Sequence, residues 1–355
     1  MTERLRAEVA ADVARAAELL RASGTVAFPT ETVYGLGANA LDAHAVAKIF
    51  AAKERPGWDP LIVHVEGRTM VSQVAHVGDD EVGRRVSALM EAFWPGPLTL
   101  LLPRTSLVPD AVTAGRPLVG VRMPRHPVAR ELIRLAGVPV AAPSANRFGH
   151  TSPTTAAHVL ADLDGRIDAV LDGGATEVGV ESTVAEVVKD GVVIYRPGPI
   201  DFGSIDSFNE NNMGWVRHYV SLGMREAQES LPAPGVDLRH YAPRARVVLV
   251  EDIVEGALSR RGGRLESSLV GAIDAAFEGD GSVGVMLPEG WDASCASAVY
   301  RWGKWGDAEG LARRLFAGLR ELDDAGVKVI VCPVPEMGGL GEAIRDRLEK
   351  AARAL

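Results

Sequence analysis

The stretch from Thr25 to Val65 constrains the fold of this chain most strongly. It begins with the apolar run 25–28, passes through the polar segment 30–32, and ends in a second apolar run, 61–65. β-Branched and aromatic residues favour strands, and Pro29 cannot donate to a sheet ladder, so the first strand should end there. The pattern predicts an α/β fold in which a polar loop follows a strand, the usual place for small ligands.

A helix predicted to begin after Asp42, its expected N-cap, ends with two cations, Lys53 and Arg55. These cations have two interpretations. They could complement the helix macrodipole, or they could bind an anion, since arginine offers a planar fork and lysine a point charge. Their position between two apolar strands, opposite the polar loop, favours the anion site.

The amino-acid composition limits the classes of protein to which this chain can belong. With 355 residues the chain is expected to form two domains, and 47% hydrophobic and 24% charged residues are typical of a soluble globular protein. The net charge of −9 argues against broad attraction to nucleic acid. Only two cysteines, no zinc-like histidine spacing and no membrane-length apolar run favour a cytoplasmic protein without a metal site or a membrane segment.

Strands and helices alternate along the chain, which indicates two α/β regions. Hairpin signals in the first 200 residues favour a twisted mixed sheet over a purely parallel one. Residues 201–245 read as a linker, with a short helix near 215–228, and strands and helices alternate again from residue 246 as in a smaller Rossmann-like domain. The predicted domains are therefore 1–200, 201–245 and 246–355.

Polar residues recur at the predicted ends of strands and helices. Each has an ordinary alternative as a turn, a surface cation or a strand residue, and Ser152 before Pro153 is also a candidate helix cap. Together they favour a ligand cleft, because polar groups converge at strand ends in α/β proteins. The candidates are Thr32, Lys53, Arg55, His64, Arg122, Ser144, Asn146, Ser182 and Arg196.

Several long motifs in one order resemble the YrdC-like family. They are Pro-Thr-Glu-Thr-Val-Tyr-Gly-Leu-Gly at 29–37, Lys-x-Arg-Pro at 53–56, Pro-Leu-Ile-Val-His at 60–64, Trp-Pro-Gly-Pro-Leu-Thr at 94–99, Val-Arg-Met-Pro at 121–124 and Ala-Pro-Ser-Ala-Asn at 142–146. The tail, with Arg-His-Tyr-Ala-Pro at 239–243 and Gly-Leu-Gly-Glu-Ala-Ile-Arg-Asp-Arg-Leu at 339–348, is similar to the long two-domain members, the threonylcarbamoyl-AMP synthases.

The resemblance implies a YrdC-like catalytic domain that makes threonylcarbamoyl-AMP and pyrophosphate from L-threonine, bicarbonate and ATP. Downstream proteins would transfer the threonylcarbamoyl group to adenosine 37 of tRNA. By motif, Lys53 and Arg55 would be catalytic, and threonine would contact Thr32, His64, Arg122, Ala142 and Ser182. ATP, with Mg²⁺ on its triphosphate, would contact Lys53, Arg55, Asp59, Leu118, Ser144, Asn146, Ser152, Arg196 and Tyr241.

One position departs from the family pattern, and two other functions stay open. Asp59 stands where the family commonly has asparagine, so an extra anion would face the nucleotide unless Mg²⁺ offsets it. The first alternative is a module that binds RNA weakly, double-stranded RNA included, which the acidic net charge disfavours. The second is a carbamoyltransferase using carbamoyl phosphate, whose known members also carry acylphosphatase and zinc-finger regions that this chain lacks.

Overall fold

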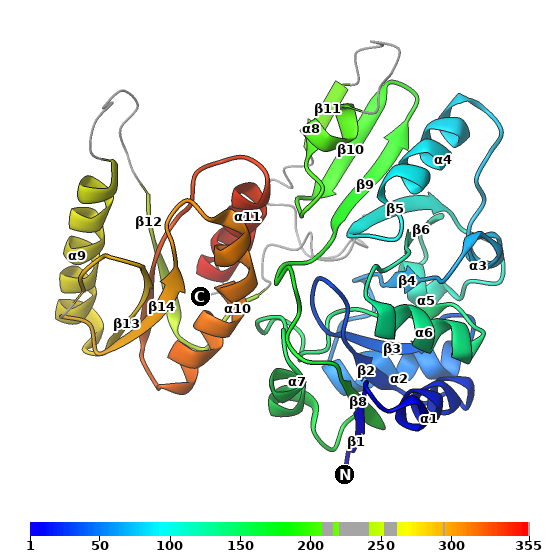
Figure 1. Ribbon diagram of the computed structural model, residues 1–355, viewed down its shortest axis with the longest axis horizontal. Helices are drawn as coiled ribbons and strands as arrows, with labels where there is room; N and C mark the ends of the chain where they lie inside the picture. The colour runs from blue at the N-terminus through cyan, green and yellow to red at the C-terminus, as the bar shows by residue number, and fades with distance from the viewer. Residues whose placement is uncertain (208–215, 220–240, 252–260, 294, 354–355) are drawn as a thin grey trace. The chain divides into compact units, whose positions relative to one another are not determined.

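The computed structural model describes residues 1–207, 216–219, 241–251, 261–293 and 295–353, which fall into two compact units (Figure 1). The first unit comprises Met1–Phe148 and Ser152–Asp237, and the second comprises Gly149–Thr151 and Leu238–Leu355. Arg239 and His240 of the predicted linker lie outside the described residues. The helix expected near 215–228 is wrong in its described part, because residues 216–219 form a strand that pairs with residues 191–194.

The first unit alternates strands and helices along the chain. Its strands are β1 (Glu3–Arg6), β2 (Val26–Phe28), β3 (Gly35–Asn39), β4 (Ile62–His64), β5 (Leu98–Pro103), β6 (Leu118–Arg122), β7 (Val140–Ala141), β8 (Ala169–Asp172), β9 (Thr183–Val188), β10 (Gly191–Arg196) and β11 (Val216–Tyr219). Its helices are α1 (Ala10–Arg21), α2 (Ala43–Lys53), α3 (Arg68–Val74), α4 (Glu81–Phe93), α5 (Asp110–Thr113), α6 (Pro127–Ala136), α7 (Ala156–Leu163) and α8 (Phe202–Asp206).

These strands form one mixed sheet in the order β1-β8-β2-β3-β7-β4-β6-β5-β9-β10-β11. Parallel pairs such as β4 with β6 and β5 with β9 alternate with antiparallel pairs such as β2 with β3 and β9 with β10. The edge strand β1 pairs with β8, so residues 3–6 lie against residues 169–172. The mixed sheet predicted for this region is confirmed.

Two apolar clusters cover the sheet and explain why these helices form. One packs α1 and α6 through side chains that include Leu20 and Leu132, and the other packs α2 and α4 through Ile49 and Leu89. The Asp42 carboxylate accepts a hydrogen bond from the N–H of residue 44, which confirms it as the N-cap of α2. The sheet is therefore buried on both faces, and its polar groups lie at strand ends.

The second unit has a fully parallel sheet in the order β12-β15-β13-β14. Its helices lie on both faces, with α9 on one and α10 and α11 on the other (Figure 1). This arrangement confirms the predicted Rossmann-like unit. The elements are β12 (Arg246–Val250), α9 (Arg261–Asp280), β13 (Val283–Pro288), β14 (Ala298–Gly303), α10 (Ala308–Asp324), β15 (Val329–Pro333) and α11 (Leu340–Ala352). None of the helices within the described ranges combines the length and apolarity needed to cross a membrane.

Candidate functional site

The loop between β2 and β3 holds three polar residues, Thr30, Glu31 and Thr32, in one fixed arrangement. The Thr30 hydroxyl lies 2.8 Å from the Thr32 hydroxyl. The backbone carbonyls of Glu31 and Thr32 accept hydrogen bonds from the N–H groups of Val178 and Gly179 at 2.9 and 3.0 Å. Because the loop is hydrogen-bonded internally and from a neighbouring segment, its side chains are preorganised at the carboxyl end of β2.

Arg122, the last residue of β6, is held in three directions. Its Nη2 lies 2.6 Å from Glu31 Oε1, its Nη1 donates to the Thr32 hydroxyl at 3.0 Å, and its Nε donates to the Gly96 carbonyl at 3.2 Å. The Arg122 and Glu31 side chains are 4% and 0% exposed. A guanidinium carries five N–H groups, so two remain for another acceptor.

His64 ends β4 and is the register partner of Arg122 on the neighbouring strand. Burial, with the nearby Arg122 charge adding to it, lowers the pKa of His64 to about 3. The imidazole is therefore neutral at physiological pH. Its ring packs edge-on against Phe28.

Ser182 lies at the start of β9 in a hydroxyl network. Its Oγ is 2.8 Å from the Thr99 hydroxyl and accepts a hydrogen bond from Arg196 Nη2 at 3.0 Å. The N–H of Thr183 donates to the Pro97 carbonyl at 3.0 Å. That contact brings the network beside the segment whose Gly96 carbonyl holds Arg122.

Lys53 ends α2 with a fully buried ammonium group. Its Nζ donates to the Ser144 carbonyl at 2.6 Å and to the Asn146 carbonyl. Burial, together with the positive charge of Arg55, lowers the pKa of Lys53 well below its usual value. The structure thus places Lys53 beneath the 144–146 loop, where two of its three N–H groups hold backbone carbonyls.

Arg55 is directed toward the segment that follows α2. Its Nη2 lies 2.8 Å from Asp59 Oδ2 and donates to the Pro60 carbonyl at 2.8 Å, while its Nε donates to the Asp59 carbonyl at 3.1 Å. Arg55 and Asp59 are 7% and 0% exposed. The acidic side chain at position 59 therefore neutralises Arg55 directly.

The segment from Ala142 to Asn146 joins the two groups of residues. The N–H of Ala142 donates to the Ile62 carbonyl at 2.9 Å, which holds it beside the strand that ends in His64. Ser144 forms a bridge with Gly35, just beyond the polar loop. The structure therefore brings Ala142, Ser144 and Asn146 to the end of the sheet that carries the polar loop.

Ser152 has a different role from the predicted helix cap. Its hydroxyl donates to the Glu181 carboxylate, whereas the Thr155 side chain accepts from the N–H of His158 and caps α7. The expected cap at Ser152 is wrong, because α7 begins three residues later than the Ser152-Pro153 pattern indicates. The contact with Glu181 instead places Ser152 next to the Ser182 network.

Two predicted site residues lie elsewhere. Leu118 begins β6 and so lies at the opposite end of that strand from Arg122, packed in an apolar cluster with Ile62. Tyr241 belongs to the second unit, where its 2% exposed ring packs against Phe316 and Arg347 at centroid distances of 5.6 and 5.4 Å. Their assignment to ATP stays a prediction.

Several residues that contact the predicted ones were not named as site residues from the sequence, although Glu31 lies in the predicted ligand loop. They are Glu31, Gly96, Thr99 and Glu181. Glu31 stands between two threonines in the motif 29–37, Gly96 and Thr99 belong to the motif 94–99, and Glu181 adjoins Ser182. Position inside or beside a motif was therefore an available signal, but nothing in the sequence pairs Glu31 with Arg122.

Buried polar atoms without hydrogen-bond partners gather around Arg122. Among the described residues, Arg122 Nη2, both carboxylate oxygens of Glu31 and His64 Nδ1 are inaccessible and accept or donate no well-aligned hydrogen bond. The contact between Arg122 and Glu31 is thus an ion pair by distance. Burial raises the pKa of Glu31, but the Arg122 charge and the backbone N–H groups of residues 31 and 125 lower it below its usual value, so the carboxylate is compensated within the protein.

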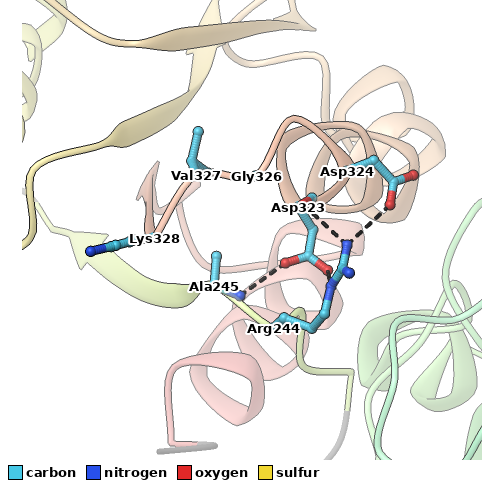
Figure 2. Close-up of a pocket in the computed structure, with 7 residues that line it drawn as sticks. All are labelled: Arg244, Ala245, Asp323, Asp324, Gly326, Val327 and Lys328. Carbon is cyan, nitrogen blue, oxygen red and sulfur yellow. Dashed lines mark hydrogen bonds and ion pairs between the residues drawn. The ribbon is translucent and has the colours of Figure 1, made fainter.

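A separate cavity of 420 Å³ lies in the second unit. Figure 2 shows the Arg244 guanidinium turned toward Asp323 and Asp324, with an Nε to Oδ2 distance of 2.9 Å to Asp323. Arg244 and Lys328 precede β12 and β15, so the cavity lies at the amino ends of these parallel strands. Ligands of open parallel sheets bind at the carboxyl ends, so the first unit holds the stronger candidate.

Comparisons with known proteins find relatives that match both units of the chain. A family model described as telomere recombination matches residues 18–198, and one described as threonylcarbamoyl-AMP synthase, C-terminal domain, matches residues 207–353. The threonylcarbamoyl-AMP synthase of Pyrococcus abyssi is 41% identical over 338 residues, covering 95% of this chain and 93% of that protein. The Bacillus subtilis protein of the same name is 41% identical over 343 residues, covering 96% and 92%.

A solved structure agrees with the fold of the whole chain. The crystal structure of Pyrococcus abyssi Sua5 complexed with L-threonine has a TM-score of 0.87 and 38% identity, covering 100% of this chain and 98% of that one. The chain therefore belongs to the threonylcarbamoyl-AMP synthase family of nucleotidyltransferase enzymes, in its two-domain Sua5 form.

Proposed function

We propose that this chain forms L-threonylcarbamoyl-AMP and pyrophosphate from L-threonine, bicarbonate and ATP. One observation carries the proposal: Arg122, at the carboxyl end of β6, is held by Glu31, Thr32 and the Gly96 carbonyl, with His64 as its register partner on β4. It is supported by the relatives named for this reaction product and by the related crystal structure that holds L-threonine.

The reaction requires positioning more than a protein nucleophile. The α-ammonium of threonine and bicarbonate give a carbamate with release of water and one proton. A carbamate oxygen then attacks the α-phosphorus of ATP, and pyrophosphate leaves. Such phosphoryl transfer depends mainly on alignment and charge neutralisation, which suits a site of arginines, hydroxyls and backbone groups.

The threonine subsite of this proposal is centred on Arg122. Its two remaining N–H groups suit a carboxylate, which prefers the guanidinium fork. Neutral His64 and the hydroxyls of Thr32 and Ser182 supply further hydrogen-bonding groups, and Ala142 supplies backbone. Exclusion of water by this buried environment favours the carbamate, which decomposes readily in water.

The nucleotide subsite of the proposal lies along the 144–146 loop and the end of α2. In this proposal the triphosphate lies against Arg55. Lys53 donates to the Ser144 and Asn146 carbonyls, so it acts on the nucleotide through that loop. The remaining proposed ATP contacts are Asp59, Leu118, Ser152, Arg196 and Tyr241.

Mg²⁺ enters the proposal with the triphosphate. The described residues contain no group of three or more histidine, cysteine or acidic side chains arranged to hold a metal. Mg²⁺ is commonly bound through one or two carboxylates plus substrate phosphates, but the Asp59 carboxylate is 0% exposed and paired with Arg55, so Mg²⁺ would be held mainly by the phosphates. The metal would neutralise phosphate charge beside Arg55.

The product would be consumed in the cytoplasm by proteins that transfer the threonylcarbamoyl group to adenosine 37 of tRNA. An activated acyl adenylate is a substrate for such transfer. Weak binding of double-stranded RNA by this chain stays a separate prediction. A filter-binding assay over a salt series checks it, since contacts with phosphates weaken steeply as salt rises.

The deciding experiment measures pyrophosphate release by the full chain. Release should require ATP, threonine and bicarbonate together, and mass spectrometry should find threonylcarbamoyl-AMP. Arg122→Lys should raise KM for threonine about 10-fold or more and leave KM for ATP nearly unchanged, because lysine lacks the bidentate fork. Arg134→Lys, on the exposed face of α6, is the matched control. Pyrophosphate release without threonine would contradict the proposal.

A further inference from the structure

Glu54 ends α2 in an unusual backbone conformation, between the two cations Lys53 and Arg55. Its φ of 54° and ψ of 36° lie in the left-handed region. This conformation costs free energy for a residue with a Cβ, and glycine is the usual choice at the end of a helix. A carboxylate at this position also opposes the helix macrodipole. Glu54 therefore breaks two local rules directly beside the residues predicted to be catalytic.

The left-handed turn at Glu54 separates its two neighbours. The N–H of Arg55 donates to the Phe50 carbonyl at 3.0 Å, as in the Schellman motif that ends many helices. Lys53, the last residue of α2, donates to carbonyls of the 144–146 loop, whereas Arg55 donates to the carbonyls of residues 59 and 60. The conformation of position 54 thus sends two adjacent cations to different segments.

The Glu54 carboxylate joins two further segments of the first unit. Its Oε2 accepts a hydrogen bond from Arg147 Nη2, and its Oε1 accepts one from Arg166 Nη1 at 2.8 Å. Arg147 follows Asn146 in the loop proposed to hold the nucleotide, and Arg166 lies in the turn between α7 and β8. The hydrogen bonds from Arg147 and Arg166 lower the pKa of Glu54 below its usual value, so the carboxylate is ionised at physiological pH.

The last turn of α2 therefore holds the loop after β7 from several sides. The Lys53 ammonium holds two carbonyls of residues 144–146, and the Lys53 carbonyl accepts from the N–H of Phe148 at 2.8 Å. Glu54 adds the contact with Arg147, and these two side chains are 51% and 39% exposed. Because that contact lies at the surface, a change at Glu54 acts on the loop without opening the core.

We propose that Glu54 is a positioning residue for the nucleotide, which fixes the 144–148 loop against the end of α2 through Arg147 and Arg166. This inference rests on the proposed function, because that function places ATP along the loop. Backbone strain persists where surrounding contacts determine it, and it gathers at functional sites. A ligand binds more weakly as the fraction of protein in the competent conformation falls, so loss of Glu54 should weaken ATP binding and leave the chemical step unchanged.

The test measures pyrophosphate release by the full chain while ATP is varied at saturating threonine and bicarbonate. Glu54→Gln should raise KM for ATP about 3- to 10-fold, as expected for loss of two half-exposed ion pairs, and keep kcat within about 2-fold. Calorimetric titration with α,β-methylene-ATP, which cannot release pyrophosphate, should show the same loss of affinity. The affinity for L-threonine should stay within about 2-fold. A fall in kcat with KM for ATP unchanged would contradict a role in positioning the nucleotide.

Glu54→Gly separates the carboxylate from the backbone. Glycine adopts the left-handed conformation readily, so this variant relieves the strain while it removes both ion pairs. It should raise KM for ATP as Glu54→Gln does. A wild-type KM for ATP in Glu54→Gly would show that position 54 acts through its backbone alone, and the inference would be overturned.

A change on the loop side of the contact tests the coupling. Arg147→Gln should also raise KM for ATP, and the double variant Glu54→Gln, Arg147→Gln should lie within about 2-fold of Glu54→Gln, because both changes remove one contact. Losses that multiply in the double variant would mean that the two side chains act independently, against the inference. Circular dichroism checks that each variant is folded.

Glu131→Gln is the matched control, because Glu131 is also a half-exposed glutamate, 2.7 Å from Arg134 on α6. It should leave KM for ATP unchanged. Salt screens exposed ion pairs, so the ratio of KM in Glu54→Gln to that in the wild type should approach one at about 0.5 M salt, and a ratio unaffected by salt would count against the inference. If the wild type releases no pyrophosphate, the proposed function fails; if it is active and both Glu54 variants keep its KM for ATP, only the inference fails.

Discussion

Arg55 and Asp59 form a buried ion pair, so a change at Arg55 acts on stability and activity together. Arg55→Ala should lower kcat/KM by about 100-fold through loss of a charge facing the triphosphate. It should also reduce the free energy of unfolding by about 3–5 kcal/mol, because the Asp59 carboxylate stays buried without this cation. Steady-state pyrophosphate release and urea unfolding measure the two effects.

A double variant separates the two effects of Arg55. Arg55→Ala combined with Asp59→Asn removes both charges and should recover most of the lost stability while activity stays low. Asp59→Asn alone should release Arg55 from its ion pair and keep activity. Full recovery of kcat/KM in the double variant would show that Arg55 has no direct role in the reaction.

His64 makes the first unit less stable as the pH falls. Its pKa is about 3 in the folded chain and about 6.5 when unfolded, so the unfolded chain binds more protons between these values. The free energy of unfolding should therefore fall as pH drops from 6.5 toward 3, by up to about 1.4 kcal/mol per pH unit. The groups acting on the imidazole charge are Arg122 and Glu31.

Hydrogen exchange of peptides covering β4, corrected for intrinsic rates, measures this dependence at pH 5 and pH 7. The variant His64→Gln cannot titrate and should show a smaller difference between the two values. His126 and Glu31 also titrate in this region, so the difference between variant and wild type isolates His64. Equal pH dependence in the two proteins would contradict the assignment.

At the scale of elements, the sequence predicted those with a strong periodic pattern. The cap at Asp42 was expected where it occurs. β3 and β14 were not expected. Gly35 and Gly37 weaken the strand pattern of β3, and β14, which spans Ala298–Gly303, mixes polar and aromatic residues. Pairing with neighbouring strands stabilises both, and such pairing is not visible in a local pattern.

The candidate site, like the fold, could be predicted only in part from the sequence. Polar residues at strand ends marked the side chains that gather around Arg122. The contact of Arg122 with Glu31 joins residues far apart in the sequence, and so does that of Lys53 with the carbonyl of Ser144. These contacts depend on strand order, which the sequence pattern did not specify.

The two glycines of β3 allow its close packing against β2 and β7. A Cβ at Gly37 would lie 2.7 Å from the Phe28 ring and 2.8 Å from Val140 Cγ1. Gly37→Ala should therefore destabilise the first unit by about 1–3 kcal/mol through overpacking. Thermal unfolding measures the change, with Gly57→Ala as control because a Cβ there meets nothing within 4 Å. Equal melting temperatures for the two variants would contradict this account of β3.

At the scale of the whole molecule, the proposed threonine residues all belong to the first unit. A first domain ending near residue 198 would lose α8, whose Ile205 is fully buried in the core, and β11. The better fragment is 1–237, the end of the compact unit. It should bind L-threonine within about 3-fold of the full chain, because Thr32, His64, Arg122, Ala142 and Ser182 are all retained.

The same fragment lacks Tyr241, so it also tests the predicted contact of Tyr241 with ATP. Pyrophosphate release should fall about 10-fold or more in the fragment, because this contact no longer positions the nucleotide. Tyr241→Ala in the full chain should give a milder loss. If the fragment, shown by circular dichroism to be folded, turns over as fast as the full chain, Tyr241 takes no part in the reaction.

The pairing of β1 with β8 has a consequence for the synthesis of this protein. The partners of residues 3–6 are residues 169–172, and β5 likewise can pair with β9 only after residues 183–185 have been made. Long-range pairings of this kind form slowly and only after the intervening chain exists. A nascent chain therefore leaves the pairing edge of β1 exposed until β8 has been synthesised.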